Sequence, residues 1–245
     1  MSNAVVVHAD ADVLAAAVAA RLAVRLIDAQ AAHGSASVVL TGGRIAEKIY
    51  TALGTSPARD AVDWSRVDLW WGDERFLPAG DPDRNETQAR AVLLDALPVP
   101  ADRVHPIPAS DGPDGADPEA AAARYAGELA SAGSATLPRF DVVLLGIGED
   151  GHVASIFPDH TVSQPSGPVS AVRDSPKPPP IRTTLTLPTL NSAEDVWILA
   201  AGEGKADAVG WALNARPEHH VPAGAVHGTI RTLWLLDRDA AAQIK

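Results

Sequence analysis

The most reactive side chains of the sequence stand together in the stretch LLGIGEDGH, residues 144–152. An apolar run ends in two glycines, and Glu149, Asp150 and His152 follow almost at once. A neutral histidine can take a proton from water near pH 7, and a neighbouring carboxylate can orient its ring. The spacing therefore predicts a general base at His152, and the glycines could expose N–H groups as an oxyanion hole. The alternative is a structural loop with a surface histidine.

A second polar group follows the apolar run VDLWW, where Asp73, Glu74 and Arg75 come directly after Gly72. The forked donors of arginine suit an anion or a developing oxyanion. We expect Arg75 to bind such a group and Asp73 to orient the guanidinium. A solvated loop with a local ion pair would have the same sequence.

A third apolar run ends in Thr41, Gly42 and Gly43, just before a predicted helix that starts near Arg44. Glycines let the backbone approach a ligand closely, and the N-terminus of a helix offers unpaired N–H groups. Together these features predict a phosphate site. A tight turn before a helix is the alternative, because the stretch is neither a Walker loop nor a GxGxxG fingerprint.

Two further cations stand where an anionic ligand could meet them. Arg182 opens a predicted strand, and Lys205 follows two glycines at the start of a predicted helix. A lysine at the N-terminus of a helix is unfavourable unless an anion binds there, which makes Lys205 a candidate phosphate ligand. A plain surface lysine is the alternative. No HExxH or other regular spacing of metal ligands occurs, so no metal is expected.

These polar residues can form one site only if helices and strands bring them together. The pattern of apolar residues predicts such helices and strands. The predicted strands cover residues 4–10, 35–43 (a strand and then a glycine turn), 67–75 (a strand and then a polar turn), 140–148, 182–190, 195–202 and 232–237. The predicted helices run from Asp10 or Asp12 to Gly34 and over 44–54, 85–98 (with Asn85 as cap), 117–133 and 204–214. This alternation predicts an α/β fold with one domain over 1–245 and a mainly parallel, Rossmann-like sheet flanked by helices. The Pro-rich segment 158–181 is expected to be a long loop or flap. Ligands of such sheets bind beyond the carboxyl ends of the strands, where all three polar groups stand.

The composition narrows the choice of partner. The 245 residues are 46% hydrophobic and carry a formal net charge of −11, which argues against nucleic acid or an acidic membrane surface as the partner. A small anionic substrate would need local positive groups. The absence of cysteine excludes disulfides and thiolate chemistry and fits a cytoplasmic location. Neither a secretory signal nor a run of about 18 apolar residues is visible.

Four stretches in family order carry a resemblance that covers essentially the whole chain. They are LTGG, WWGDERFLPAGDPDRNETQA (70–89), FDVVLLGIGEDGHVASIFPDH (140–160) and RTTLTLPTLNSAEDVWILAAGEGKADAV (182–209). The chain resembles the 6-phosphogluconolactonase family, and the resemblance implies the α/β fold shared with glucosamine-6-phosphate deaminase, ribose-5-phosphate isomerase and CoA transferases. The implied reaction is hydrolysis of 6-phosphogluconolactone in the oxidative pentose phosphate pathway, without a metal or organic cofactor. The oligomeric state is expected to be a monomer or a small homo-oligomer.

The resemblance also implies roles for individual residues. His152 looks like the family's general base, which activates water and then returns the proton to the ring oxygen. Asp150 and Glu149 belong to the same motif and look like orienting groups. The backbone of Gly42 and Gly43, together with Arg75, Arg182 and Lys205, looks like the binding site for the 6-phosphate and the developing oxyanion.

One departure and two alternatives remain open at this point. Many relatives carry Ser or Thr and then Pro after the double glycine, whereas here Arg44 follows, which either adds charge to the phosphate pocket or points to solvent. The first alternative is glucosamine-6-phosphate deaminase, whose loop after the histidine reads like Phe-Asn-Glu-Pro where this chain has residues 155–158, SIFP. That family also typically has Tyr at the position of Arg75. The second alternative is a non-catalytic sugar-phosphate binding protein.

Overall fold

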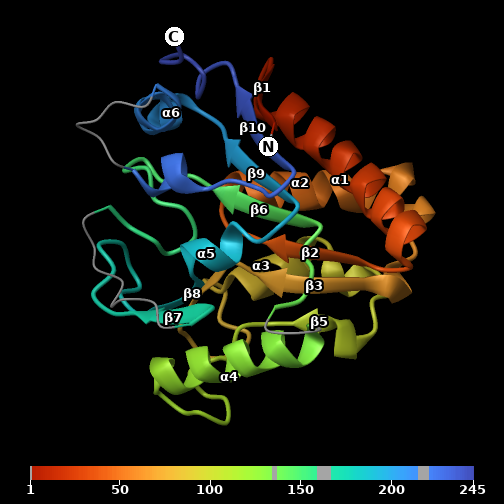
Figure 1. The fold of residues 1–245 in the computed structure, drawn as a ribbon, viewed down its shortest axis with the longest axis vertical. Coiled ribbons are helices and arrows are strands. Elements are labelled where there is room, and N and C mark those ends of the chain that lie inside the picture. Colours follow the sequence, from red (N-terminus) through yellow and green to blue (C-terminus); the bar gives the residue numbers. More distant parts are fainter. Residues whose placement is uncertain (1, 134–136, 159–166, 215–220) are drawn as a thin grey trace.

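The computed structural model describes residues 2–133, 137–158, 167–214 and 221–245. Its centre is a seven-stranded sheet in the order β1-β10-β9-β6-β2-β3-β5, in which all neighbouring strands are parallel. These strands follow one another from top to bottom in Figure 1. Their bounds are β1 Ser2–His8, β10 Arg231–Asp237, β9 Asp195–Ala200, β6 Val142–Gly146, β2 Ala36–Leu40, β3 Val67–Trp71 and β5 Val104–His105. The prediction of a mainly parallel α/β fold is confirmed.

Helices cover the sheet, and α1 has the caps predicted for it. Helices α1 (Ala11–His33) and α2 (Arg44–Thr55) pack against each other in the upper right of Figure 1, and α4 (Pro118–Ala132) runs along the bottom. Asp10 Oδ1 accepts hydrogen bonds from Asp12 N and Val13 N at the start of α1, and Gly34 ends it with a φ of 83°. The remaining helices are α3 Asn85–Val92, α5 Leu187–Leu190 and α6 Ala206–Leu213. No helix of the described residues is long and apolar enough to cross a membrane.

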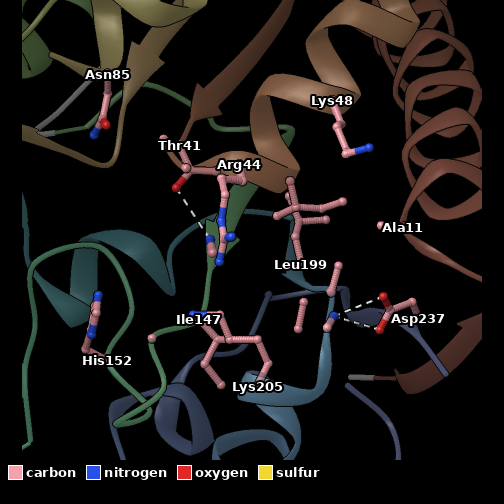
Figure 2. A pocket seen from close by; sticks show the side chains of 18 of the residues that line it. Ala11, Thr41, Arg44, Lys48, Asn85, Ile147, His152, Leu199, Lys205 and Asp237 are labelled. Atoms are coloured by element: carbon pink, nitrogen blue, oxygen red, sulfur yellow. Dashed lines mark hydrogen bonds between the residues drawn. The ribbon is translucent and has the colours of Figure 1, made fainter. Parts of the chain in front are cut away.

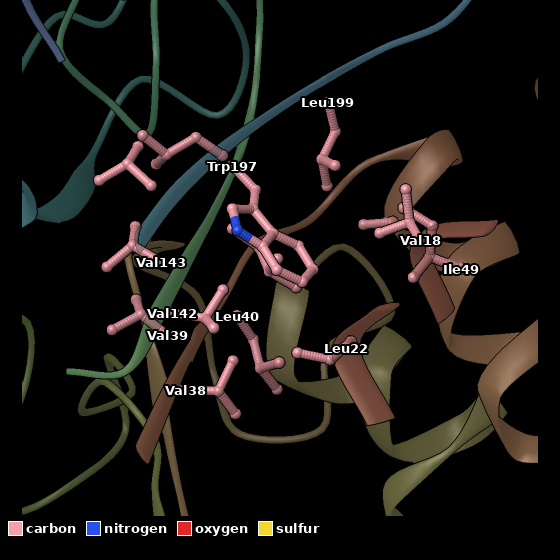
Figure 3. Close-up of a cluster of buried hydrophobic side chains, with 14 of the residues drawn as sticks. Val18, Leu22, Val38, Val39, Leu40, Ile49, Val142, Val143, Trp197 and Leu199 are labelled. Atoms are coloured by element: carbon pink, nitrogen blue, oxygen red, sulfur yellow. The ribbon is translucent and has the colours of Figure 1, made fainter. Parts of the chain in front are cut away.

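The hydrophobic core lies between the central strands and the pair α1 and α2. Strands β2 and β9 are buried along their whole length, as expected for central parallel strands covered on both faces. Figure 3 shows Trp197 of β9 between the valines of β2 and β6 and the side chains of the two helices. This packing fixes the strands from whose ends the polar residues project.

A second, three-stranded antiparallel sheet was not predicted from the sequence. It has the order β4-β8-β7, with β4 Asp73–Arg75, β8 Arg182–Leu185 and β7 Val169–Val172. The predicted polar turn after VDLWW is therefore β4. The predicted flap 158–181 contains β7, and its residues 159–166 lie outside the described part.

Two predicted elements are shorter than expected. The strand predicted over 182–190 ends at Leu185, because Pro188 has no N–H for a ladder and instead stands in the first turn of α5. The helix predicted over 85–98 ends at Val92, where Leu93 leaves the helical conformation with φ −145° and ψ −60°. A short 3₁₀ turn, Leu94–Ala96, follows it.

The strand order creates a crevice at one edge of the large sheet. Strands β2 and β6 are neighbours, but the chain leaves β2 toward β3 and leaves β6 toward β9. This reversal is the topological switch point at which open parallel sheets bind ligands. Thr41 follows β2 there, and its Oγ1 accepts a hydrogen bond of 3.4 Å from the N–H of Gly146 at the end of β6.

Candidate active site

A cavity of about 730 Å³ opens at this switch point. Its wall comes from the ends of β2, β6, β9 and β10, from the start of α2, and from the small sheet (Figure 2). Nine of the eleven residues predicted for the site line it: Thr41, Gly42, Gly43, Arg44, Asp73, Arg75, His152, Arg182 and Lys205. The other two, Glu149 and Asp150, lie on the same loop as His152 but behind the cavity wall.

His152 is held by Asp150 in an orientation that suits a base. The Nδ1 atom of His152 lies 2.5 Å from Oδ1 of Asp150. Since an ionised carboxylate only accepts hydrogen bonds, Nδ1 carries the proton and Nε2 keeps its lone pair. Burial lowers the pKa of His152 below its ordinary value, although Asp150 acts in the opposite direction. The imidazole is therefore neutral near pH 7 and able to accept a proton.

The glycines of this loop make room for the pair and do not form the predicted oxyanion hole. A Cβ on Gly148 would lie 2.0 Å from Nδ1 of His152 and 2.3 Å from Oδ1 of Asp150, so only glycine fits there. The N–H of Gly148 donates to the carbonyl of His152, and the N–H of Gly151 donates to the carbonyl of Gly148. Thr41 engages the N–H of Gly146. The prediction that these glycines expose free N–H donors is wrong, because the N–H groups of Gly146, Gly148 and Gly151 all have acceptors within the protein.

Glu149 does not orient the base. Its side chain is exposed, and its charge acts on Lys205 rather than on His152. A Cβ on Gly204 would lie 3.5 Å from Oε1 of Glu149, which places this carboxylate against the turn that carries Lys205. Asp150 thus bonds to His152, whereas its neighbour Glu149 interacts with Lys205.

Positive charge gathers at the start of α2. Gly43 is the N-cap of α2 with a φ of 98°, and no side chain caps this helix end. Figure 2 shows Arg44 in the middle of the cavity, above Ile147 and Lys205, so Arg44 is part of the pocket. Burial lowers the pKa of Lys205, and the charges of Lys177 and Arg44 lower it further. An uncapped helix N-terminus beside cations that repel one another favours an anion.

Lys177 joins this group and was missed in the sequence analysis. It lines the cavity, and its Nζ lies 3.5 Å from Oδ1 of Asp150, the oxygen that also holds His152. Arg182 explains how Lys177 comes there. The guanidinium of Arg182 donates to the carbonyls of residues 177, 178 and 179 at 3.2, 2.9 and 2.8 Å. The signal in the sequence was a lysine within SPKPPP, directly before the predicted strand of Arg182.

Asp73 and Arg75 line the opposite wall, but they do not pair with each other. Oδ2 of Asp73 accepts a hydrogen bond of 2.7 Å from the buried hydroxyl of Ser155. Arg75 donates to the carbonyl of Asp83, and its buried Nε has no hydrogen-bond partner among the described residues. The expectation that Asp73 orients Arg75 is therefore wrong, because Ser155 and Asn85 occupy this carboxylate.

Asn85 has a different place from the predicted one. The sequence predicts Asn85 as the cap of this helix, whereas in the structure it is the first helical residue of α3, with Arg84 as N-cap. The Asn85 side chain is buried in the cavity wall and donates to the carbonyl of Asp73 at 2.9 Å. The stretch RNETQA after GDER was its only signal in the sequence.

One group of the described residues has the geometry of a metal site, and it lies at the other edge of the sheet. His33, Asp141 and Glu194 have ligand atoms within 4.8 Å of one another. These residues stand near the N-terminal ends of β6 and β9, and Arg25 already binds Glu194 at 2.7 Å. A cation would have to displace that guanidinium.

The cavity thus combines a neutral imidazole with a set of cations and an uncapped helix end. An imidazole whose Nε2 is free can deprotonate a bound water. Arginine and lysine side chains can hold an anionic substrate and stabilise negative charge that develops during the attack. The arrangement fits addition of water to an electrophilic carbon of an anionic substrate.

Comparisons with known proteins agree with this chemistry. Residues 9–234 match the family model described as glucosamine-6-phosphate isomerases/6-phosphogluconolactonase. The chain is 58% identical to the 6-phosphogluconolactonase of Streptomyces coelicolor over 98% of this chain and 94% of that protein. It is 45% identical to the 6-phosphogluconolactonase of Mycobacterium tuberculosis over 100% and 99%. The solved structure of 6-phosphogluconolactonase from Trypanosoma brucei superposes with a TM-score of 0.82 at 31% identity, covering 100% of this chain and 99% of that one.

Proposed function

The chain belongs to the glucosamine-6-phosphate isomerase/6-phosphogluconolactonase family, and on this basis we propose that it hydrolyses 6-phospho-D-glucono-1,5-lactone to 6-phospho-D-gluconate. The observation that carries the proposal is the bond between His152 Nδ1 and Asp150 in a cavity lined with cations. The bond leaves Nε2 free to serve as the base, and the cations supply the local positive charge that an acidic protein needs for an anionic substrate.

In the proposed mechanism His152 moves one proton twice. Nε2 takes a proton from water while the water oxygen bonds to C1 of the lactone, and the carbonyl electrons move onto the oxygen as an oxyanion. The tetrahedral intermediate collapses, the bond from C1 to the ring oxygen breaks, and His152 returns its proton to that oxygen. Asp150 stabilises the imidazolium between the two transfers, as the carboxylate of a catalytic triad does.

The cations divide between the two negative groups of the substrate. We assign the 6-phosphate to the N-terminus of α2 together with Arg44 and Lys205, because this helix end lacks a cap and the two cations face it. We assign the oxyanion to Arg75, because this arginine lines the cavity and forms no ion pair within the described part of the chain. Lys177 and Arg182 close the remaining side of the pocket.

The test is lactone hydrolysis by the wild type and His152→Ala side by side. The lactone also opens spontaneously, so the formation of 6-phosphogluconate is followed with an excess of a coupling dehydrogenase and the rate without enzyme is subtracted. We expect rapid hydrolysis by the wild type and a fall in kcat of about 10²–10⁴ in the variant, as loss of a general base gives. Near-normal kcat in the folded variant would remove His152 from this role. A wild type that does not accelerate hydrolysis would contradict the proposed function, and ammonia release from glucosamine 6-phosphate would then be measured.

The organisation and location of the enzyme belong to the same proposal. We propose one catalytic domain over 1–245 that acts as a monomer or a small homo-oligomer in the cytoplasm. All residues assigned to the pocket come from one chain, and the absence of cysteine suits a reducing compartment. Light scattering during gel filtration and fractionation of cells test the two statements.

A further inference from the structure

Strand β4 carries alternate residues to opposite sides. Asp73 and Arg75 line the cavity, whereas Glu74 between them is 1% exposed and is not part of the cavity wall. This alternation is the ordinary pleat of a strand. The mechanism proposed above uses the two outer residues and gives no role to the carboxylate between them.

The carboxylate of Glu74 accepts three backbone hydrogen bonds from two separate elements. Oε1 accepts from the N–H of Arg75 at 2.8 Å and from the N–H of Asn85 at 2.7 Å. Oε2 accepts from the N–H of Glu86 at 2.9 Å. The last two donors are the first N–H groups of α3, which has no side-chain cap of its own. Glu74 therefore caps α3 from outside the helix and ties it to β4.

A buried arginine completes this arrangement without reaching the cavity. Arg84 is 1% exposed, and its Nη2 lies 3.8 Å from Oε2 of Glu74. The same guanidinium donates to the carbonyls of Leu77 at 3.2 Å and Ile107 at 2.7 Å. The charge of Glu74 is thus compensated inside the protein, so this carboxylate does not need a ligand to balance its charge.

The hydrogen bonds by which Glu74 joins α3 to β4 affect the cavity wall through Asn85. The side chain of Asn85 donates to the carbonyl of Asp73 and stands directly against Gly42, where a Cβ would lie 1.8 Å from its Oδ1. A shift of α3 relative to β4 would therefore move Asp73 and Arg75 and would open the contact with Gly42. His152 and Asp150 lie on another loop and would keep their mutual bond.

We propose that Glu74 is a positioning residue for the proposed hydrolysis: its carboxylate fixes β4 to the start of α3 and so holds Asp73, Arg75 and Asn85 in the cavity wall. This inference rests on the proposed function. Its effect on the reaction passes through those three residues, because Glu74 itself does not face the substrate.

The proton equilibrium of Glu74 supports a role beyond stability. Burial raises the pKa of Glu74 to about 7, although Arg84 and the three N–H donors oppose the rise. A carboxyl group whose pKa rises on folding stabilises the fold at low pH and loses that contribution as the pH rises from about 4.5 to about 7. Keeping this group ionised near neutral pH therefore costs stability.

Other charged groups also face this carboxylate. They are Arg84 at the N-cap of α3, Glu86 from α3 and Arg182 from β8; the neutral hydroxyl of Tyr125 from α4 also faces it. Only the ionised form of Glu74 accepts all three N–H bonds at full strength, because protonation turns one oxygen into a hydroxyl, which is a donor and a weaker acceptor. The tie is therefore complete above a pH of about 7 and loosens below it.

The experiment compares Glu74→Gln with the matched control Glu86→Gln. Both substitutions remove a carboxylate beside Arg84. Among the described residues, however, the side chain of Glu86 bonds only Arg84 and Arg90, at 3.3 and 2.8 Å, and it does not line the cavity. For folded Glu74→Gln we expect a fall in kcat of about 10- to 100-fold, as for a reacting group held out of place. For Glu86→Gln we expect kcat within twofold of the wild type. Circular dichroism and thermal midpoints give the folded fraction by which each kcat is corrected.

The pH profile separates positioning from a purely structural role. In the wild type, kcat should fall as the pH drops below about 7, because Glu74 is then protonated. A second fall in kcat is expected at lower pH, where His152, whose pKa lies lower, becomes protonated. Glu74→Gln should lose the first fall and keep the second. A folded Glu74→Gln with kcat within twofold of the wild type, or with an unchanged pH profile, would overturn the inference.

A second variant covers the case in which Glu74→Gln does not fold. Glu74→Asp keeps the charge but is one methylene shorter, so it cannot hold both α3 and Arg75. We expect it to fold with a kcat between those of the wild type and the His152→Ala variant, and a normal kcat would overturn the inference. An inactive wild type would instead contradict the proposed function, and the inference would fall with it.

Discussion

The two edges of the large sheet use the same kinds of charged side chain for opposite purposes. At the edge where the strands begin, Arg25, Arg139 and Arg231 all bind the buried carboxylates of Asp141 and Asp195. At the edge where the strands end, Arg44, Arg75 and Lys205 form no ion pair within the described part of the chain. Paired charges close one end of the fold, and unpaired charges leave the other end ready for an anion.

The difference follows from the geometry of parallel strands. Chain connections enter all strands at one edge and leave them at the other, so each edge gathers residues from distant parts of the sequence. Asp141 accepts the N–H of Ser37 at 2.8 Å and thereby joins the start of β6 to the start of β2. At the other end the same two strands separate around Thr41 and Gly146, and the cavity begins there. Stability and binding are thus assigned to opposite ends of the same strands.

The largest effect that tests this division is expected at the paired edge. Asp141→Ala would leave the N–H of Ser37 and the guanidinium of Arg139 without their carboxylate in a site that is 0% exposed. Removing one partner of a buried pair costs about 3–5 kcal/mol, and we expect this loss in the free energy of unfolding, measured with urea. The kcat of the folded fraction should stay within twofold of the wild type. A tenfold loss of kcat without loss of stability would break the comparison.

The next effect is expected at the catalytic edge. In Gly148→Ala the new Cβ would collide with His152 and Asp150, both closer than 2.5 Å, and would push the imidazole away. We expect kcat to fall about 100-fold, because a base displaced by an ångström loses its alignment. The free energy of unfolding should fall less than in Asp141→Ala. A control with alanine at Gly127, whose Cβ would meet nothing within 4 Å, should leave kcat unchanged.

A smaller effect is expected for a single cation of the open edge. Lys205→Met keeps the length of the side chain and removes its charge. We expect KM for the phosphorylated lactone to rise about tenfold with little change in kcat, because phosphate binding contributes equally to the ground state and the transition state. Lys245→Met, which removes an exposed lysine that does not line the cavity, serves as control. A normal KM in Lys205→Met would move the phosphate away from this residue.

The smallest effect concerns a paired group remote from the base. Burial lowers the pKa of His105, but hydrogen bonds to Asp68 and Glu128 outweigh it and raise the pKa to about 9. The protonated form is thus stabilised by folding, so this contribution is complete below pH 6.5 and disappears as the pH rises to about 9. Both carboxylates are partly exposed, so we expect on the order of 1 kcal/mol. Urea unfolding of the wild type and His105→Gln at pH 6 and pH 9.5 measures it, and an equal difference at both values would contradict this assignment.

The sequence predicted the elements whose information is local. Helix α1 shows its cap Asp10, its apolar repeat and its final Gly34 within one continuous stretch, and β6 is a continuous apolar run. The small sheet could not be predicted in the same way. Strand β4 has three residues, too few to show a period, and its partner β8 begins at Arg182, more than a hundred residues further along the chain.

The residues of the candidate active site were likewise predicted only where the sequence information is local. The position after a strand was enough to indicate Thr41, His152 and Arg75, because the fold class alone places strand ends at one edge. The partners of these residues depend on tertiary contacts, so Lys177 was missed and Asp73 received the wrong partner. Glu149 looked equivalent to its neighbour in the motif, and only the path of the turn separates their directions.

The pairing of β1 with β10 bears on how the chain is made. Ser2 lies opposite Arg231, so the first strand finds its only sheet neighbour near the end of the sequence. Contacts between such distant residues form late, because closing a long loop costs entropy before the contact stabilises it. During synthesis on the ribosome β1 therefore remains unpaired until β10 has emerged. A strand that precedes all the others of the large sheet in the sequence is thus among the last to pair.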